Sequence, residues 1–131
     1  MANLIVKGGK ALNGEITPAG NKNSALPILC ATLLTDEDIV INNFPELTDV
    51  TKLIELMQEL GSYVEWDKEK QVVKINNSKF CKSFGDAGLP LGMRGALLIL
   101  APLLVRHGEL KIKQEIGGCA LGIREIDPHL E

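Results

Sequence analysis

An internal repeat limits how this chain can fold more than any other feature of its sequence. Residues 23–41 align with residues 94–112 at a constant offset of 71, so that Ala25 pairs with Ala96. Both copies begin with an apolar run of helical length and end in an alternating, strand-like pattern. The apolar run leaves no wholly polar face, which is typical of a buried helix. The repeat therefore predicts an α/β chain built from units that each begin with a buried helix.

The two units differ by an insertion near the end of the chain. Asp49 of the first unit matches Asp127 of the second once seven extra residues are allowed, and these fall around the segment GGCALG. A helix and two strands are expected after Asp49, whereas the second unit stops at Glu131. Since a repeat needs these elements to cover its core, we expect the sequence to be the first part of a longer protein. The expected division is an N-terminal hairpin at 1–21 and a partial domain at 22–131, which comprises a first repeat at 22–76, a connector at 77–90 and an incomplete second repeat at 91–131.

Local patterns place the elements of the first unit. The apolar spacing after Asp49 is helical, with Asp49 as the expected cap and Gly61 as the expected end. The preceding helix is expected to start with Asn23 or Ser24 as its cap and to end near Thr35. Strands are expected at 38–44, 63–67 and 71–76, and residues 3–17 are expected to form a hairpin.

Composition and charge narrow the class of partner. A net charge of -3 and a pI near 5.4 give no overall attraction to nucleic acid or to an anionic membrane. The three cysteines form no CxxC pair, which disfavours a disulfide framework and a zinc site. The N-terminus lacks the apolar core of a signal peptide, and the longest apolar run is too short to span a bilayer. We expect a cytoplasmic protein whose anionic ligands are held by local cations.

Two polar residues at the start of the first buried helix form a candidate anion site. The segment GNKNSALP places Lys22 and Asn23 where unpaired backbone N–H groups and the helix dipole favour a phosphate or a carboxylate. The repeat puts Arg94 at the position of Asn23, so a cation marks the second buried helix as well. Two such helix starts could face one anionic ligand. On these residues alone, an exposed loop lysine and an exposed arginine remain the alternatives.

The inserted segment carries a thiol beside a cation. Gly117 and Gly118 precede Cys119, and Arg124 follows it, which suits a thiolate or a tuned acid on a glycine-hinged loop. An idle loop cysteine is the alternative that the residues leave open. Cys30, in contrast, lies among apolar neighbours and is expected to be a core residue.

Other polar residues near the end of the chain have simpler interpretations. His129 could pair with Cys119 in a protease-like dyad, but the local sequence supplies neither an orienting third group nor an oxyanion hole. His107 and His129 do not show the ligand spacing of a metal site. Because Asp127 matches Asp49, it is most simply a helix cap.

Three segments in a fixed order carry a family resemblance: GNKNSALPILCATLL, GMRGALLILAPLLVRHG and GGCALGIREIDPHLE. Together they resemble the UDP-N-acetylglucosamine 1-carboxyvinyltransferase family of enolpyruvyl transferases, over essentially the whole chain but only the N-terminal part of that family's longer chain. The resemblance implies an inside-out barrel of repeated βαβαββ units, whose helices pack inside and whose sheets face solvent, with two similar domains around a cleft. The hairpin at residues 1–21 would then belong to the other domain, or would pair with another copy through its unpaired strands.

The resemblance also implies an activity. Enzymes of this family transfer enolpyruvyl from phosphoenolpyruvate to the 3-hydroxyl of UDP-N-acetylglucosamine and release phosphate, without a cofactor, in the first committed step of peptidoglycan synthesis. Cys119 matches the family's general acid, which bonds phosphoenolpyruvate covalently and is alkylated by fosfomycin. Lys22, Asn23 and Arg124 match positions that contact phosphoenolpyruvate. Arg94 and the run Arg124, Glu125, Ile126, Asp127 and Pro128 match the nucleotide-sugar site.

Several features of the sequence bear on that assignment. Glu125 stands where the family often has proline and Pro128 where it has leucine, which affects the fine geometry of the nucleotide site more than the class. The family's carboxylate that takes the sugar hydroxyl proton is absent from these 131 residues, so the chain alone is expected to be inactive. The alternatives are a noncatalytic binding module, and a sister enzyme that uses shikimate 3-phosphate. The sister family has Lys-Ser where this chain has Lys22 and Asn23, and it lacks such a cysteine loop.

Overall fold

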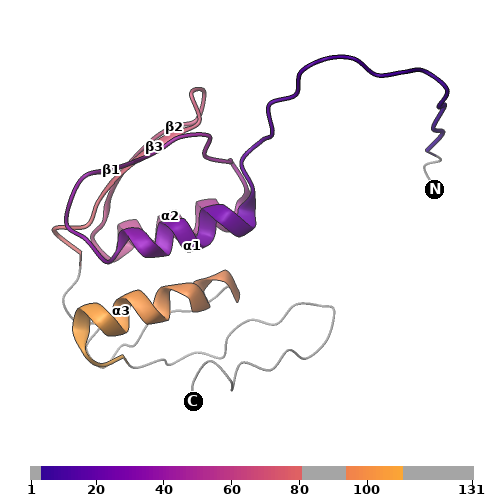
Figure 1. Cartoon of the computed structure of the whole chain (residues 1–131). Helices are drawn as coiled ribbons and strands as arrows, with labels where there is room; N and C mark the ends of the chain where they lie inside the picture. The colour runs from indigo at the N-terminus through magenta and orange to yellow at the C-terminus, as the bar shows by residue number, and fades with distance from the viewer. Residues whose placement is uncertain (1–3, 81–93, 111–131) are drawn as a thin grey trace.

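The computed structural model describes residues 4–80 and 94–110, which contain a three-stranded antiparallel sheet and four helical elements (Figure 1). The elements run in the order α1 (Lys22–Thr32), β1 (Ile39–Ile41), α2 (Thr48–Glu59), β2 (Tyr63–Asp67), β3 (Val72–Asn76), the 3-10 helix η2 (Arg94–Ile99) and α3 (Leu100–His107).

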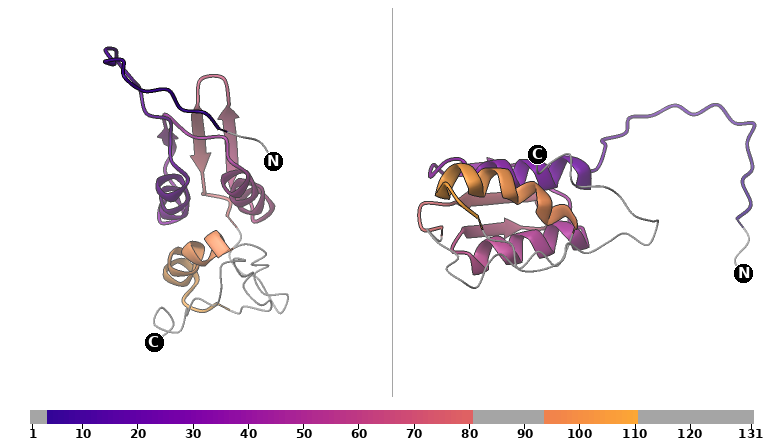
Figure 2. Two further views of the ribbon diagram at one scale, coloured as in Figure 1. Left: turned by 90° about the vertical axis from the view of Figure 1, so that its right-hand side faces the viewer. Right: turned by 90° about the horizontal axis from the view of Figure 1, so that it is seen from below.

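The described elements form three layers, with α1 and α2 in the middle. Figure 2 shows the sheet on one side of α1 and α2, and η2 with α3 on the other. Leu29 of α1 and Met57 of α2 are fully buried in this middle layer. On the outer face of the sheet Lys74 and Glu65 are exposed, and their charged groups lie 3.4 Å apart. Helices inside and a solvent-facing sheet confirm the expected α/β fold class.

The sheet has the order β1-β3-β2, with β3 in the centre and all pairs antiparallel. β2 and β3 form the expected hairpin. At its turn the Lys70 N–H donates to Asp67 Oδ1 at 2.9 Å, and this bond lowers the pKa of the Asp67 carboxyl. Gln71 completes the turn with a φ of 55°. Val73 and Ile75 of β3 point into the core and are almost fully buried, so this strand joins the sheet to the helical layer.

Several element boundaries differ from the sequence-based prediction. α1 ends at Thr32 rather than near Thr35, because the next residues close a tighter turn in which the Leu33 N–H donates to the Cys30 carbonyl at 3.1 Å. β1 covers Ile39–Ile41 rather than residues 38–44, since Asn43 has a φ of 54°, a left-handed conformation that a strand does not allow.

The expected N-terminal hairpin does not form in this structure. Residues 4–21 contain no strand, and Figure 1 shows this segment leading away from the packed layers. A short hairpin is marginal in water without a third strand or a helix to cover it, and no such element packs on this segment within the described residues. Its large apolar side chains are 80% exposed or more: Leu4, Ile5, Val6, Leu12 and Ile16. That this segment belongs to another domain stays a prediction.

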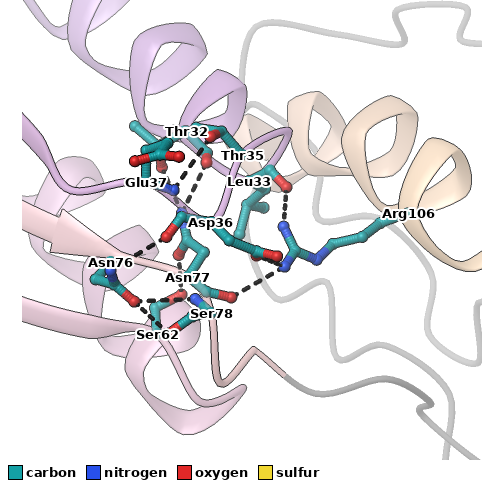
Figure 3. A network of polar contacts seen from close by, with 10 residues as sticks. All are labelled: Thr32, Leu33, Thr35, Asp36, Glu37, Ser62, Asn76, Asn77, Ser78 and Arg106. Atoms are coloured by element: carbon teal, nitrogen blue, oxygen red, sulfur yellow. Dashed lines mark hydrogen bonds and ion pairs between the residues drawn. The ribbon is translucent and has the colours of Figure 1, made fainter.

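Arg106 attaches the second unit to the first (Figure 3). Its guanidinium donates to the backbone carbonyls of Leu33 and Asn77, the latter at 3.0 Å, and to the Asp36 carboxylate. Asn77 is itself buried and donates through Nδ2 to the Thr32 carbonyl at 2.8 Å. One side chain of α3 therefore ties together the end of α1 and the segment that follows β3.

Candidate functional site

Gly20, just before α1, lies where the chain passes very close to the loop before α2. A Cβ atom at Gly20 would lie 2.2 Å from the Asn43 carbonyl oxygen and 2.7 Å from Pro45 Cδ, so only glycine fits between these groups. Asn43 also donates through Nδ2 to the Pro18 carbonyl at 3.3 Å. The loop before α2 thus fixes where α1 begins.

Asn21, and not Asn23 or Ser24, caps α1. Its backbone is extended, with φ -109° and ψ 140°, and its side chain accepts a hydrogen bond from the Asn23 N–H at 2.7 Å. The predicted cap was therefore wrong by two or three residues. The shift puts Lys22 and Asn23 in the first turn of α1, where both are exposed. Their position at a helix start agrees with the sequence-based prediction.

The start of α2 lies next to the start of α1. Lys22 Nζ donates to Asp49 Oδ2 at 2.9 Å, and the two side chains are 48% and 43% exposed. The sequence predicted Asp49 as the cap of α2, and this prediction is wrong. Leu47 occupies the cap position without a side-chain bond, and Asp49 lies in the first turn. Local sequence patterns do not predict this contact, because it joins residues 27 positions apart.

The helical segment of the second unit begins at the same end of the molecule. η2 opens at Arg94 and packs against both α1 and α2. Figures 1 and 2 show α1, α2 and η2 starting at one shared end and running in the same direction. Helix dipoles aligned in this way add positive potential where the unpaired N–H groups of the first turns lie. An anion is the ligand that this end of the molecule favours.

Several of the predicted site residues cannot be placed in this arrangement. Cys119, Arg124, Glu125, Ile126, Asp127 and Pro128 lie outside the described residues, and so does the side chain of Arg94. Of the candidate set, the structure therefore positions Lys22 and Asn23, together with the backbone of Arg94, and it adds Asp49 beside Lys22.

Cys30 is a core residue, as its neighbours predicted. It is 2% exposed, and burial raises the pKa of its thiol to about 12. A thiol with such a pKa stays protonated near neutral pH and does not act as a nucleophile. Cys30 therefore takes no part in the candidate site.

A surface hollow of about 290 Å³ lies at the other end of α1. It is lined by residues 33–36 together with Val105 and Arg106. The Arg106 guanidinium there is already bound by two backbone carbonyls and by Asp36 (Figure 3). The charged groups in the hollow are therefore already paired with each other or with the backbone. The hollow is also separated from Lys22 by the length of α1.

Among the residues placed by the structure, no three His, Cys, Asp or Glu side chains gather closely enough to hold a metal ion. Within residues 4–80 and 94–110, no helix is both long and apolar enough to cross a membrane.

Comparison with known proteins gives consistent similarities. Residues 6–131 match the EPSP synthase (3-phosphoshikimate 1-carboxyvinyltransferase) family. Two proteins named UDP-N-acetylglucosamine 1-carboxyvinyltransferase are similar: one from Sulfurovum sp. (strain NBC37-1) is 42% identical over 131 residues, and one from Methylacidiphilum infernorum (isolate V4) is 44% identical over 130 residues. These alignments cover 100% and 99% of this chain, which spans 30% of the length of each of these curated relatives.

A similar fold is found among solved structures. The enolpyruvyl transferase NikO from Streptomyces tendae superposes with a TM-score of 0.61 at 24% sequence identity. The match covers 77% of this chain and 23% of that chain. At this level of identity the likeness is evidence for the fold alone.

Proposed function

The chain belongs to the EPSP synthase (3-phosphoshikimate 1-carboxyvinyltransferase) family, and we propose that it forms part of an enolpyruvyl transferase that acts on UDP-N-acetylglucosamine. The reaction moves the enolpyruvyl group of phosphoenolpyruvate to the 3-hydroxyl of the sugar and releases phosphate, in the cytoplasm, as a step of peptidoglycan synthesis. Relatives named for this reaction align over the whole chain at 41–44% identity, which supports the choice of acceptor.

One observation of the structure carries the proposal. The starts of α1, α2 and η2 lie at one end of the molecule, and the half-exposed Lys22 ammonium lies beside Asp49 at the starts of α1 and α2. Phosphoenolpyruvate is a small anion with a phosphate and a carboxylate, and such a ligand needs cations and backbone N–H donors that do not have to rearrange. The same groups would stabilise the charge that moves onto the departing phosphate.

Each candidate residue has a role in the proposed reaction. The sugar oxygen adds to C2 of phosphoenolpyruvate while C3 takes a proton, and phosphate then leaves from the tetrahedral ketal as a C3 proton is lost. We assign the C3 proton donor to Cys119, whose thiol also forms the covalent adduct with phosphoenolpyruvate. Lys22, Asn23 and Arg124 would hold phosphoenolpyruvate. Arg94 and the run from Arg124 to Pro128 would hold the nucleotide sugar.

The activity is tested in a chimera in which this chain replaces the matching 131-residue segment of the Sulfurovum relative, 42% identical to it. We expect the chimera to release phosphate when both substrates are present, and the 131-residue chain alone to release none. Lys22→Ala should lower kcat/KM for phosphoenolpyruvate about 10- to 100-fold, the effect of losing a charged hydrogen bond. Lys52→Ala removes an exposed lysine of α2 and should change it less than about twofold. A folded chimera without turnover would contradict the proposal.

The acceptor is tested by titration of the 131-residue chain itself. The backbone amide signal of Asn23 is followed by NMR, with phosphoenolpyruvate present, as UDP-N-acetylglucosamine or shikimate 3-phosphate is added. We expect saturable shifts with the nucleotide sugar and none with the shikimate ester. The opposite result would favour the sister reaction that the family description names. No shift with either compound would favour a module that does not bind substrate.

The thiol assignment has its own test. The chimera is treated with fosfomycin in the presence of UDP-N-acetylglucosamine and is mapped by mass spectrometry. We expect the adduct on Cys119. Cys30 is an internal control, because it is 2% exposed and the pKa of its thiol is about 12. Labelling of Cys81 in place of Cys119 would overturn the assignment.

A further inference from the structure

We propose that Asp49 is a positioning residue for Lys22, whose ammonium it holds at the shared start of α1 and α2. The inference rests on the proposed function, in which Lys22 binds phosphoenolpyruvate, and adds a residue that works through Lys22 rather than on the substrate. Asp49 Oδ2 accepts a hydrogen bond from Lys22 Nζ at 2.9 Å. Neither helix could place the ammonium in this way by itself, because the two residues belong to different helices.

The chemistry of a lysine ammonium makes such a partner useful. Lysine is a point charge on a flexible four-carbon stem, so its side chain loses much rotamer freedom when a ligand fixes it. Asp49 takes one of the three ammonium donors and leaves two for the oxygens of a ligand. The loss of freedom then occurs when the chain folds and not when the ligand binds.

A purely structural role for the pair is the weaker explanation. With side chains 48% and 43% exposed, the pair contributes little to stability. Neither helix needs it in order to begin. Asn21 caps α1, and at the start of α2 both the N–H and the Oγ1 of Thr51 donate to the Leu47 carbonyl, at 2.9 and 3.2 Å.

A carboxylate near an anion site also repels the ligand, and the two effects must be compared. Both side chains are half-exposed, so water and salt screen the repulsion between Asp49 and a bound anion. Solvent does not screen the other effect, which is the restriction of the Lys22 rotamers by Asp49. We therefore expect removal of Asp49 to weaken the binding of phosphoenolpyruvate rather than to strengthen it.

The chain supplies a matched control. Glu46 lies just before α2 and forms an exposed ion pair with Lys68, in the β2–β3 turn. Glu46→Ala removes a carboxylate from the same helix start without touching Lys22. If the charge near the start of α2 alone mattered, Glu46→Ala and Asp49→Ala would act alike.

The experiment is a double-mutant cycle in the chimera, with kcat/KM for phosphoenolpyruvate as the readout. Asp49→Ala should lower it about tenfold, Asp49→Asn by less because an acceptor oxygen remains, and Glu46→Ala by less than about twofold. In a Lys22→Ala background, Asp49→Ala should have no further effect. Thermal unfolding of each variant of the 131-residue chain should change little.

Three outcomes would overturn the inference. Asp49→Ala could leave kcat/KM within about twofold of the unsubstituted chimera, could remain harmful in the Lys22→Ala background, or could unfold the 131-residue chain. Failure of the proposed function looks different, because the unsubstituted chimera would then fold and release no phosphate. In that case the inference falls with the function on which it rests.

Discussion

The attachment of α3 to the first unit depends on one arginine, and its removal should have a large effect on stability. Arg106 is 20% exposed and donates to the carbonyls of Leu33 and Asn77, two residues that are fully buried. It also pairs with Asp36, whose side chain is 65% exposed. Arg106→Met keeps most of the apolar stem and removes all of these donors.

The cost can be estimated from the separate contacts. Each bond to a backbone carbonyl contributes roughly 1 kcal/mol net, and somewhat more when the carbonyl is left buried without a partner. The ion pair between Arg106 and Asp36 adds less than about 1 kcal/mol, because the Asp36 carboxylate is largely exposed to water. Arg106→Met should therefore lower the free energy of unfolding by about 3 kcal/mol, a substantial part of the roughly 5–15 kcal/mol of a typical domain.

Two further variants separate the contributions. Arg106→Lys keeps the charge but not the planar fork that reaches three oxygens, so it should still cost about 2 kcal/mol. Asp36→Asn removes only the exposed charge and should cost less than about 1 kcal/mol. Urea unfolding at 25 °C, followed by circular dichroism, gives the three values. Equal stability of Arg106→Lys and the unsubstituted chain would contradict this role of the guanidinium, and so would an Asp36→Asn cost as large as that of Arg106→Met.

Three further predictions concern other parts of the molecule. Burial raises the pKa of the Cys30 thiol from 9.0 to about 12. The folded chain therefore keeps this proton where the unfolded chain loses it, and the free energy of unfolding should fall by about 1.4 kcal/mol between pH 8 and pH 10. Urea titrations at both pH values should show this decrease in the unsubstituted chain and not in Cys30→Ala. Gly20→Ala should cost about 1–3 kcal/mol in the same assay, because its Cβ would meet the Asn43 carbonyl at 2.2 Å, whereas Gly14→Ala has no atom within 4 Å and should be neutral. Deletion of residues 1–17 should leave the melting temperature unchanged, since residues 4–17 are exposed, and should reduce any self-association seen by sedimentation; a large drop in melting temperature would show that the segment packs on the domain.

Much of the first unit could be predicted from its sequence because the information is local. The apolar spacing of α2 and the polar turn between β2 and β3 each lie within about a dozen residues, and both elements appeared where the pattern placed them. The cap of α1 was misplaced because Asn21, Asn23 and Ser24 all suit that position, and only the path of the chain around Gly20 decides among them. The prediction of N-terminal strands was wrong because a strand needs a partner strand, and the sequence of the strand itself cannot supply one.

For the candidate site, the sequence by itself determined that Lys22 and Asn23 stand at the start of a buried helix, since an apolar run and its polar flank are adjacent along the chain. It also determined the repeat that places Arg94 at the start of the next helix. Only the tertiary structure decided that these helices start at one end of the molecule and that Asp49 holds the Lys22 ammonium. Side-by-side packing of α1, α2 and η2 creates that proximity, and such packing depends on how whole faces of the elements fit together, which no short stretch of sequence specifies.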